Sequence, residues 1–146
     1  MAGYYDIYVL ARERSAGIAS RFLEEFAPRR EQSAVEYEFP QYSDQPNLIL
    51  TMAEDAIRHC VEHPSASQSF YFRNLGDGPA HVMLFFTEDG GLILGLSVEQ
   101  DPDGALFRLR IHARSEHGFV TFEEPPPATA DEFRRLASAA PGPRPK

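Results

Sequence analysis

His59 and His63 are the pair of side chains in this sequence whose spacing is best suited to chemistry. Four residues apart on a helix, two imidazoles project from one face, and metal sites use this spacing. A catalytic zinc site usually needs three protein ligands, however, and the neighbouring Cys60 projects elsewhere on the helix. We therefore expect no metal ion here, and two exposed imidazoles near a helix C-terminus.

Cys60 is the only cysteine of the chain, but its position does not favour a catalytic thiol. It falls in an apolar stripe, so we expect it to be buried, and burial in apolar surroundings raises the pKa of a thiol. His112, with Glu116 and His117, occupies a segment whose spacing predicts no shared metal-binding geometry.

Motifs of known catalytic sites are missing from the sequence. It contains no G-x-S-x-G, no H-E-x-x-H and no P-loop, and its carboxylates are too abundant to single out an acid and a base. We therefore expect no catalytic residue and no cofactor. A non-enzymatic protein is the favoured interpretation, with an enzyme of unrecognised site as an alternative.

The strongest candidate for a binding surface comes from alternating residues in two segments. In residues 105–113, basic side chains alternate with apolar ones, and residues 69–75 alternate in the same way. If both segments are strands of one sheet, their polar faces coincide. The surface so predicted consists of Tyr71, Arg73, Arg108, Arg110 and His112. Tyr and Arg favour interfaces, although a solvated sheet face with ordinary ion pairs is the alternative.

Length and composition limit the classes of protein that could carry this surface. A chain of 146 residues, 42% of them hydrophobic, fits one domain, placed at residues 1–140, with a disordered proline-rich tail at 141–146. A single cysteine excludes an intramolecular disulfide and favours the cytoplasm. The net charge of −8 argues against a nucleic-acid partner, and no apolar run is long enough for a membrane span.

Hydrophobic periodicity predicts alternating strands and helices in the first half. Residues 6–10, 34–39 and 48–50 are typical of strands. Ser15 is expected to cap a helix that ends near Phe26, before Pro28. Thr51 and Glu54 form a capping box for a helix that reaches about His63. In this second helix Ala53, Ala56, Ile57, Cys60 and Val61 form a continuous apolar stripe.

The second half changes to an extended pattern. Residues 69–75, 81–87, 92–98 and 105–113 are predicted as strands, separated by the turn sequences at 76–79, 88–91 and 101–104. Residues 118–122 add a further strand. Thr129 and Glu132 form another capping box, which begins a short C-terminal helix carrying Phe133, Leu136 and Ala137.

These elements predict an α+β fold. A mainly antiparallel sheet, with a β-meander in the second half, should carry the two main helices on one face. The element order of the N-terminal half matches a split βαβ, ferredoxin-like unit. Strands 82–86 and 92–98 are apolar on both faces and should lie at the centre of the sheet.

The composition and fold class favour a protein-interaction module. A compact acidic α+β domain is similar in a general way to small bacterial immunity and adaptor proteins, whose charge would speed encounter with a basic partner. A protein partner that contacts the sheet face is therefore expected, and an uncovered strand edge would allow a homodimer. The alternative is a domain that holds a small anionic ligand on the same arginines.

Overall fold

An antiparallel sheet is the framework of the computed structural model, which describes residues 3–139. In that range six strands form the main sheet in the order β2-β5-β6-β7-β1-β8, and β3 pairs with β4 in a separate two-stranded sheet. The predicted disordered tail at 141–146 lies outside the described residues. The elements are β1 (Tyr5–Leu10), α1 (Ala16–Phe26), β2 (Arg30–Gln32), β3 (Tyr37–Phe39), β4 (Leu48–Leu50), α2 (Ala53–Glu62), β5 (Gln68–Asn74), β6 (His81–Phe86), β7 (Leu92–Val98), α3 (Pro102–Ala113), β8 (Gly118–Phe122) and α4 (Ala130–Ala139).

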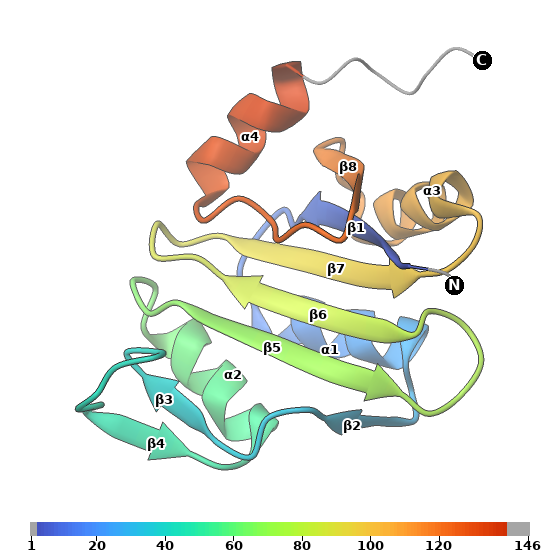
Figure 1. The fold of residues 1–146 in the computed structure, drawn as a ribbon. Helices are drawn as coiled ribbons and strands as arrows, with labels where there is room; N and C mark the ends of the chain where they lie inside the picture. The colour runs from blue at the N-terminus through green and yellow to red at the C-terminus, as the bar shows by residue number, and fades with distance from the viewer. Residues whose placement is uncertain (1–2, 140–146) are drawn as a thin grey trace.

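The predicted α+β class is confirmed, and helices cover the two faces of the sheet unequally. The side chains of α1, α2 and α3 share the main core with one face of the sheet, whereas α4 packs on the other face through Phe133 and Ala130. In Figure 1, α1 lies behind the strands and α4 lies near the opposite end of the sheet from β5. Part of the second face is therefore left without a helix.

β6 and β7 lie at the centre of the main sheet, as their apolar pattern predicts. They pair antiparallel through the turn at 88–91 and are buried along almost their whole length. β1 lies between β7 and β8 and is antiparallel to both. The sheet does not follow the ferredoxin-like arrangement, because β3 and β4 leave the main sheet and β1 pairs only with strands of the second half.

The predicted strand at 105–113 is wrong, because this segment is the helix α3. Asp101 accepts a hydrogen bond from the Gly104 amide (3.1 Å), and Pro102 occupies the first turn, a combination that begins helices. The helix buries Ala105 and Leu109, four residues apart, and exposes Phe107. Apolar residues on two faces of a helix thus imitated the alternation of a strand.

α2 confirms the predicted apolar stripe but not its predicted cap. Ala53, Ala56, Ile57 and Cys60 are buried, and Val61 is half-buried against the same core. The helix begins after Met52, whose side chain makes no cap bond, so the expected capping box at Thr51 does not form. Instead the side chain of Gln32 accepts a hydrogen bond from the Ala53 amide (2.9 Å).

The remaining predicted elements agree with the structure apart from one boundary. Ser15 caps α1 by accepting from the Ile18 amide (3.1 Å), and Thr129 accepts from the Glu132 amide (3.1 Å) at the start of α4. The strand predicted over 34–39 is shorter, because Val35 is 87% exposed and pairing is limited to Tyr37–Phe39. No helix in residues 3–139 has the length and apolar character required to cross a membrane.

Candidate functional site

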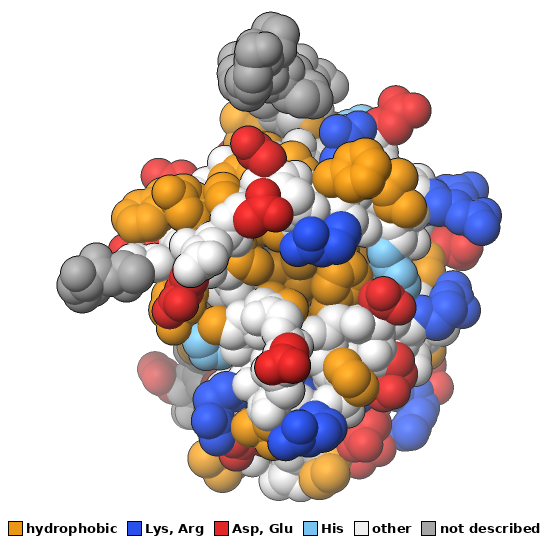
Figure 2. Space-filling model, turned by 90° about the vertical axis from the view of Figure 1, so that its right-hand side faces the viewer, with side chains coloured by type: hydrophobic (Ala, Val, Ile, Leu, Met, Phe, Trp, Pro, Cys, Tyr) orange, Lys and Arg blue, Asp and Glu red, His pale blue; other side chains and the backbone are white. Residues whose placement is uncertain are grey.

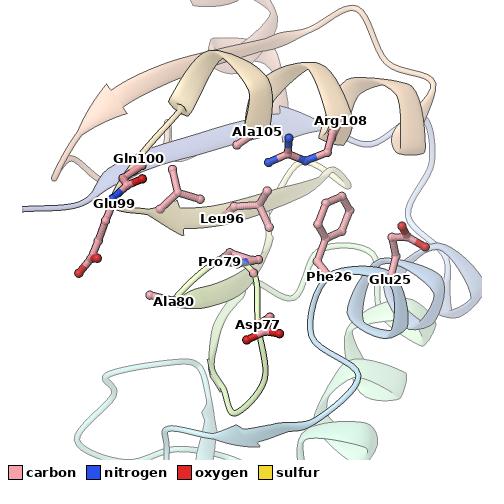
Figure 3. A pocket seen from close by; sticks show the side chains of 12 residues that line it. Glu25, Phe26, Asp77, Pro79, Ala80, Leu96, Glu99, Gln100, Ala105 and Arg108 are labelled. Atoms are coloured by element: carbon pink, nitrogen blue, oxygen red, sulfur yellow. The ribbon is translucent and has the colours of Figure 1, made fainter.

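A groove of about 580 Å³ opens where four separate segments meet at one end of the sheet. The C-terminal end of α1, the turn between β5 and β6, the last residues of β7 and the first half of α3 line it (Figure 3). β7 continues through Glu99 and Gln100 into α3, which crosses back over the helical face of the sheet. The groove therefore lies between α3 and α1, above the end of the central strands.

The floor of the groove is apolar. Leu96, Val98 and Ala105 are buried beneath it, and the half-buried ring of Phe26 contributes a side wall. In Figure 3 the Phe26 ring points from the end of α1 towards α3. Viewed from this side in Figure 2, the molecule has a hollow with an apolar floor at its centre, surrounded by charged side chains.

The rim of the groove carries more negative than positive charge. Glu25, Asp77 and Glu99 line it together with one basic residue, Arg108, which extends from α3 across the opening (Figure 3). Within residues 3–139 Arg108 forms no ion pair. Its guanidinium is thus available to an incoming group, while three carboxylates favour a ligand of net positive charge.

The turn that carries Asp77 is held in place by one side chain. The amide of Asn74 donates hydrogen bonds to the carbonyl oxygens of Asp77 (3.1 Å) and Pro79 (2.8 Å), and its oxygen accepts from the Gly76 amide (3.1 Å). Gly78, at a φ of 115°, supplies the backbone conformation that the turn needs. The acidic side of the groove is therefore fixed by the chain around it rather than by a ligand.

An exposed apolar patch lies beside the groove on α3. Phe107 and Ile111 are 66% and 63% exposed and, four residues apart, share one face of the helix. Arg108, which lines the groove, is adjacent to Phe107 and three residues before Ile111 in α3. The apolar patch and the rim of the groove are therefore neighbours on the surface of this helix. We call the groove together with Phe107 and Ile111 the α3 face.

The five residues predicted to form one binding surface do not lie together. Tyr71 and Arg73 are on β5 and face away from α1–α3, whereas Arg108, Arg110 and His112 belong to α3 on the opposite side of the sheet. The strand error at 105–113 explains this separation. An anionic ligand held by all these arginines is therefore not supported by their placement.

Each of these residues has a different environment. Arg108 lies at the rim of the groove, and Tyr71 lines a hollow on the other face. Arg73 forms an ion pair with Glu31 of β2. The remaining two support the end of α3: the Arg110 Nε donates to the Ser115 carbonyl oxygen (3.3 Å), and His112 packs edge-on against Phe26, with ring centroids 5.4 Å apart.

Sequence reasoning missed most of the α3 face. The strand predicted at 105–113 puts Phe107 and Ile111 on its apolar face, opposite Arg108 and Arg110. Glu25, Phe26 and Asp77 belong to elements far from α3 in the sequence. One signal was present, because Asp101-Pro102-Asp103 is a typical helix start that places Phe107 and Leu109 on different faces. No local signal identifies the residues of α1 and of the β5–β6 turn.

The histidine pair of α2 forms an aromatic stack. The ring centroids of His59 and His63 are 4.1 Å apart, and those of His59 and Phe39 are 4.4 Å apart. Burial, together with the neighbouring His63, lowers the pKa of His59. Between residues 3 and 139 there is no cluster of three or more His, Cys, Asp or Glu side chains suited to a metal ion.

Cys60 is fully buried, as predicted, and burial raises the pKa of its thiol to about 12. The lining of the groove, within the described residues, contains no Ser, Thr, Cys, His or Tyr. The α3 face therefore offers shape, an apolar floor and charged side chains, of which the carboxylates are the ionisable acids.

Comparisons with known proteins add no relative. No protein-family model matches the chain, and neither a curated protein nor a solved structure matches it.

Proposed function

We propose that this protein is a non-enzymatic interaction module that binds a basic protein partner through the α3 face. The observation that carries the proposal is the combination of two exposed apolar side chains, Phe107 and Ile111, with a groove of about 580 Å³ beside them that has an apolar floor and a charged rim. Exposed large apolar residues next to a hollow are typical of protein interfaces. The buried centre of an interface is usually apolar and its rim polar.

The charges around the groove favour a basic partner. Glu25, Asp77 and Glu99 outnumber Arg108 at the rim, and the whole chain carries a net charge of −8. Such a field speeds encounter with a positively charged surface and repels acidic ones. In the proposed complex an apolar side chain of the partner fills the groove, while its basic groups face the three carboxylates.

Arg108 gives the complex its orientation. A guanidinium at the edge of an apolar patch can stack on an aromatic ring or donate to carbonyl and carboxylate oxygens of the partner. An immunity or adaptor role, in which this acidic domain covers a basic surface of its partner, is the setting we propose. We therefore propose the α3 face as the contact surface, in place of the sheet face that the sequence favoured.

The test compares two matched double variants as immobilised bait against an extract of the source cells. Phe107→Asp with Ile111→Asp removes the apolar patch, and Val35→Asp with Tyr42→Asp makes the same change at two exposed apolar residues on other segments. A partner that depends on the α3 face should be retained by the wild type and the control, and lost by the first variant. Circular dichroism and melting temperature establish that both variants are folded.

The partner is then purified and its affinity measured. The α3 variant should bind at least about tenfold more weakly, since central interface residues often contribute more than 1 kcal/mol. Asp77→Lys should slow association more than Asp44→Lys does, and the difference should shrink at about 0.5 M salt, where exposed charges are screened. Equal binding by both double variants, or no partner that distinguishes them, would contradict the proposal.

A further inference from the structure

A second hollow, of about 560 Å³, lies on the face of the sheet opposite to the α3 face. It exists because α4 covers only one band of this face, where Leu10, Phe85 and Ile93 are buried beneath Phe133. The part of this face that carries Asp6, Tyr71, His81 and Ser97 is not covered by α4. This hollow is separate from the groove, and the inference drawn from it does not depend on the proposed function.

The strand register brings one carboxylate to the middle of the hollow. Asp6 of β1 pairs with Ser97 of β7, and one Asp6 oxygen accepts a hydrogen bond from the buried Ser97 hydroxyl (2.7 Å). A carboxylate has about four acceptor positions. Within residues 3–139 Asp6 forms no ion pair. Its carboxylate therefore has acceptor capacity that the protein does not use.

Aromatic rings form the walls around this carboxylate. Tyr4, Tyr8, Tyr71 and His81 line the hollow, and Tyr4 packs edge-on against His81, with centroids 5.8 Å apart. Tyr8 and Met83, which line the hollow, both pair with Gly95 of β7, where a Cβ would lie 3.1 Å from the Met83 methyl and 3.2 Å from the Tyr8 ring. Because Gly95 has no side chain, the Met83 methyl and the Tyr8 ring can pack directly on the backbone of β7.

The segment between β8 and α4 supplies the remaining wall and further negative charge. The Tyr8 hydroxyl donates to the carbonyl oxygen of Glu124 (2.5 Å), and the Tyr4 amide donates to the carboxylate of Glu123 (3.3 Å). Both glutamates line the hollow, whereas none of the Lys or Arg side chains in residues 3–139 does. Arg73, which follows Tyr71 on the same face of β5, is paired with Glu31.

We propose that this hollow binds an organic cation, an alkylammonium or guanidinium group attached to an apolar body. The faces of aromatic rings carry partial negative charge and attract cations within about 6 Å. Three carboxylates and several rings, with no Lys or Arg in the lining that the described residues form, suit such a group. A divalent metal is a poorer fit, because no cluster of three metal-ligating side chains occurs between residues 3 and 139. An anion would be repelled by the carboxylates of Asp6, Glu123 and Glu124.

The cation can come from a free small molecule or from a Lys or Arg side chain of another protein. The experiment uses ¹⁵N-labelled full-length protein and follows backbone amide shifts in NMR titrations. Benzyltrimethylammonium and agmatine are the free cations, N-acetylargininamide represents a protein side chain, and benzyl alcohol and benzoate are the neutral and anionic controls. The cations should shift the amides of Asp6, Gly95 and Ser97 selectively.

Two variants and one control assign the site. Asp6→Asn should weaken binding of the cations at least tenfold, and Asp44→Asn, in an exposed loop, should leave it unchanged. Tyr71→Ala removes an exposed wall residue, so the fold should tolerate it, and binding should weaken about threefold or more. Tyr71→Ala thus tests the site even if Asp6→Asn does not fold.

The titrations distinguish a free cation from a protein side chain, and one set of results contradicts the proposal. Tighter binding of agmatine or benzyltrimethylammonium assigns the hollow to a free cation, and tighter binding of N-acetylargininamide assigns it to a protein side chain. Equal shifts with the neutral or anionic probe, or no shift by any cation at about 10 mM, about ten times a Kd of 1 mM, would overturn the proposal.

Discussion

The carboxylate of Asp89, in the turn between β6 and β7, accepts a hydrogen bond of 2.9 Å from the backbone amide of Ala130, the first residue of α4. The Thr87 hydroxyl donates to the same oxygen (2.6 Å), and the second oxygen accepts from the Asp131 amide (3.0 Å). Helix N-termini have free amides and favour negative charge. A side chain 41 residues away in the chain therefore fixes where α4 begins.

Replacing Asp89 with alanine should lower the free energy of unfolding by about 1 kcal/mol, the usual effect of removing a helix cap. Amide hydrogens of α4 should exchange faster with solvent, while those of β6 and β7 keep their protection. Urea denaturation and hydrogen exchange measure the two effects. Glu88→Ala, a neighbouring exposed carboxylate with no hydrogen bond from α4, is the control. Equal destabilisation by both variants would contradict the role of Asp89.

The same contacts predict a dependence on pH. Burial acts to raise the pKa of Asp89, but the hydrogen bonds from Thr87, Ala130 and Asp131 outweigh it and bring the pKa to about 2, below the ordinary 3.8. Because the folded-state pKa is lowered, the stabilisation is fully present above about pH 4 and is lost as the pH falls through about 2. Wild-type stability minus that of Asp89→Asn should decrease over this interval. A stability difference that does not change with pH would show that the pKa of Asp89 is not lowered in the folded protein.

Arg14 should be irreplaceable by lysine. Its guanidinium donates hydrogen bonds to the carbonyl oxygens of five residues and lies over the ring of Phe86, 5.0 Å from its centre. These acceptors, at the end of α2 and in the β6–β7 turn, belong to Cys60, His63, Ala66, Thr87 and Gly91. A lysine ammonium cannot reach them all, and unpaired buried acceptors are costly.

We expect Arg14→Lys to lower the free energy of unfolding by about 2 to 4 kcal/mol, measured by urea denaturation. Arg12→Lys, at an exposed residue nearby, should have an effect within about 0.5 kcal/mol. If Arg14→Lys proves as mild as Arg12→Lys, the guanidinium contacts do not stabilise the fold.

The thiol of Cys60 should be inert in the folded protein. It is fully buried, and its pKa of about 12 leaves almost no thiolate near neutral pH. An aromatic disulfide reagent should label it only after unfolding in urea, and the labelling rate should follow the unfolding transition. Rapid stoichiometric labelling without denaturant would show that α2 opens easily or that the thiol is accessible.

Ile57 tests the packing of α2 against the sheet. It is 8% exposed within the main core, so Ile57→Ala should cost about 2 to 5 kcal/mol, including the cavity it leaves. Thermal and urea denaturation measure the loss. Arg58→Ala, on the exposed side of the same helix, controls for the change in helix sequence. An unchanged melting temperature for Ile57→Ala would refute the packing.

The sequence predicts an element well where one face of it is apolar and its ends carry local signals. α2 is the clearest case, because its stripe has a helical period, and α1 has both a stripe and the Ser15 cap. α3 lacks a single apolar face. Its residues Phe107, Leu109 and Ile111 alternate as in a strand, and this pattern led to a strand prediction despite the helix start at Asp101. The exposed half of that pattern is the part proposed to bind a partner.

Contacts between distant segments could not be predicted from one sequence. The amide that begins α2 is capped by Gln32 rather than by the adjacent Thr51, and α4 has a cap from Asp89 in addition to its local cap at Thr129. The same is true of the candidate site. The sequence identified Arg108, but Glu25 and Asp77 are brought next to it only by the tertiary structure. Strand order is likewise set by packing between the halves of the chain.

The position of β1 also determines the order in which the chain can fold during synthesis. Tyr5 of β1 pairs with Val98 and with Phe122, which are synthesised much later than Tyr5. The hairpins of β5, β6 and β7 can form from neighbouring residues, but β1 must wait for both partners, and contacts so distant in sequence are slow to form. A nascent chain stalled between β7 and β8 would therefore expose one edge of β1, at the stage when a chaperone is most needed.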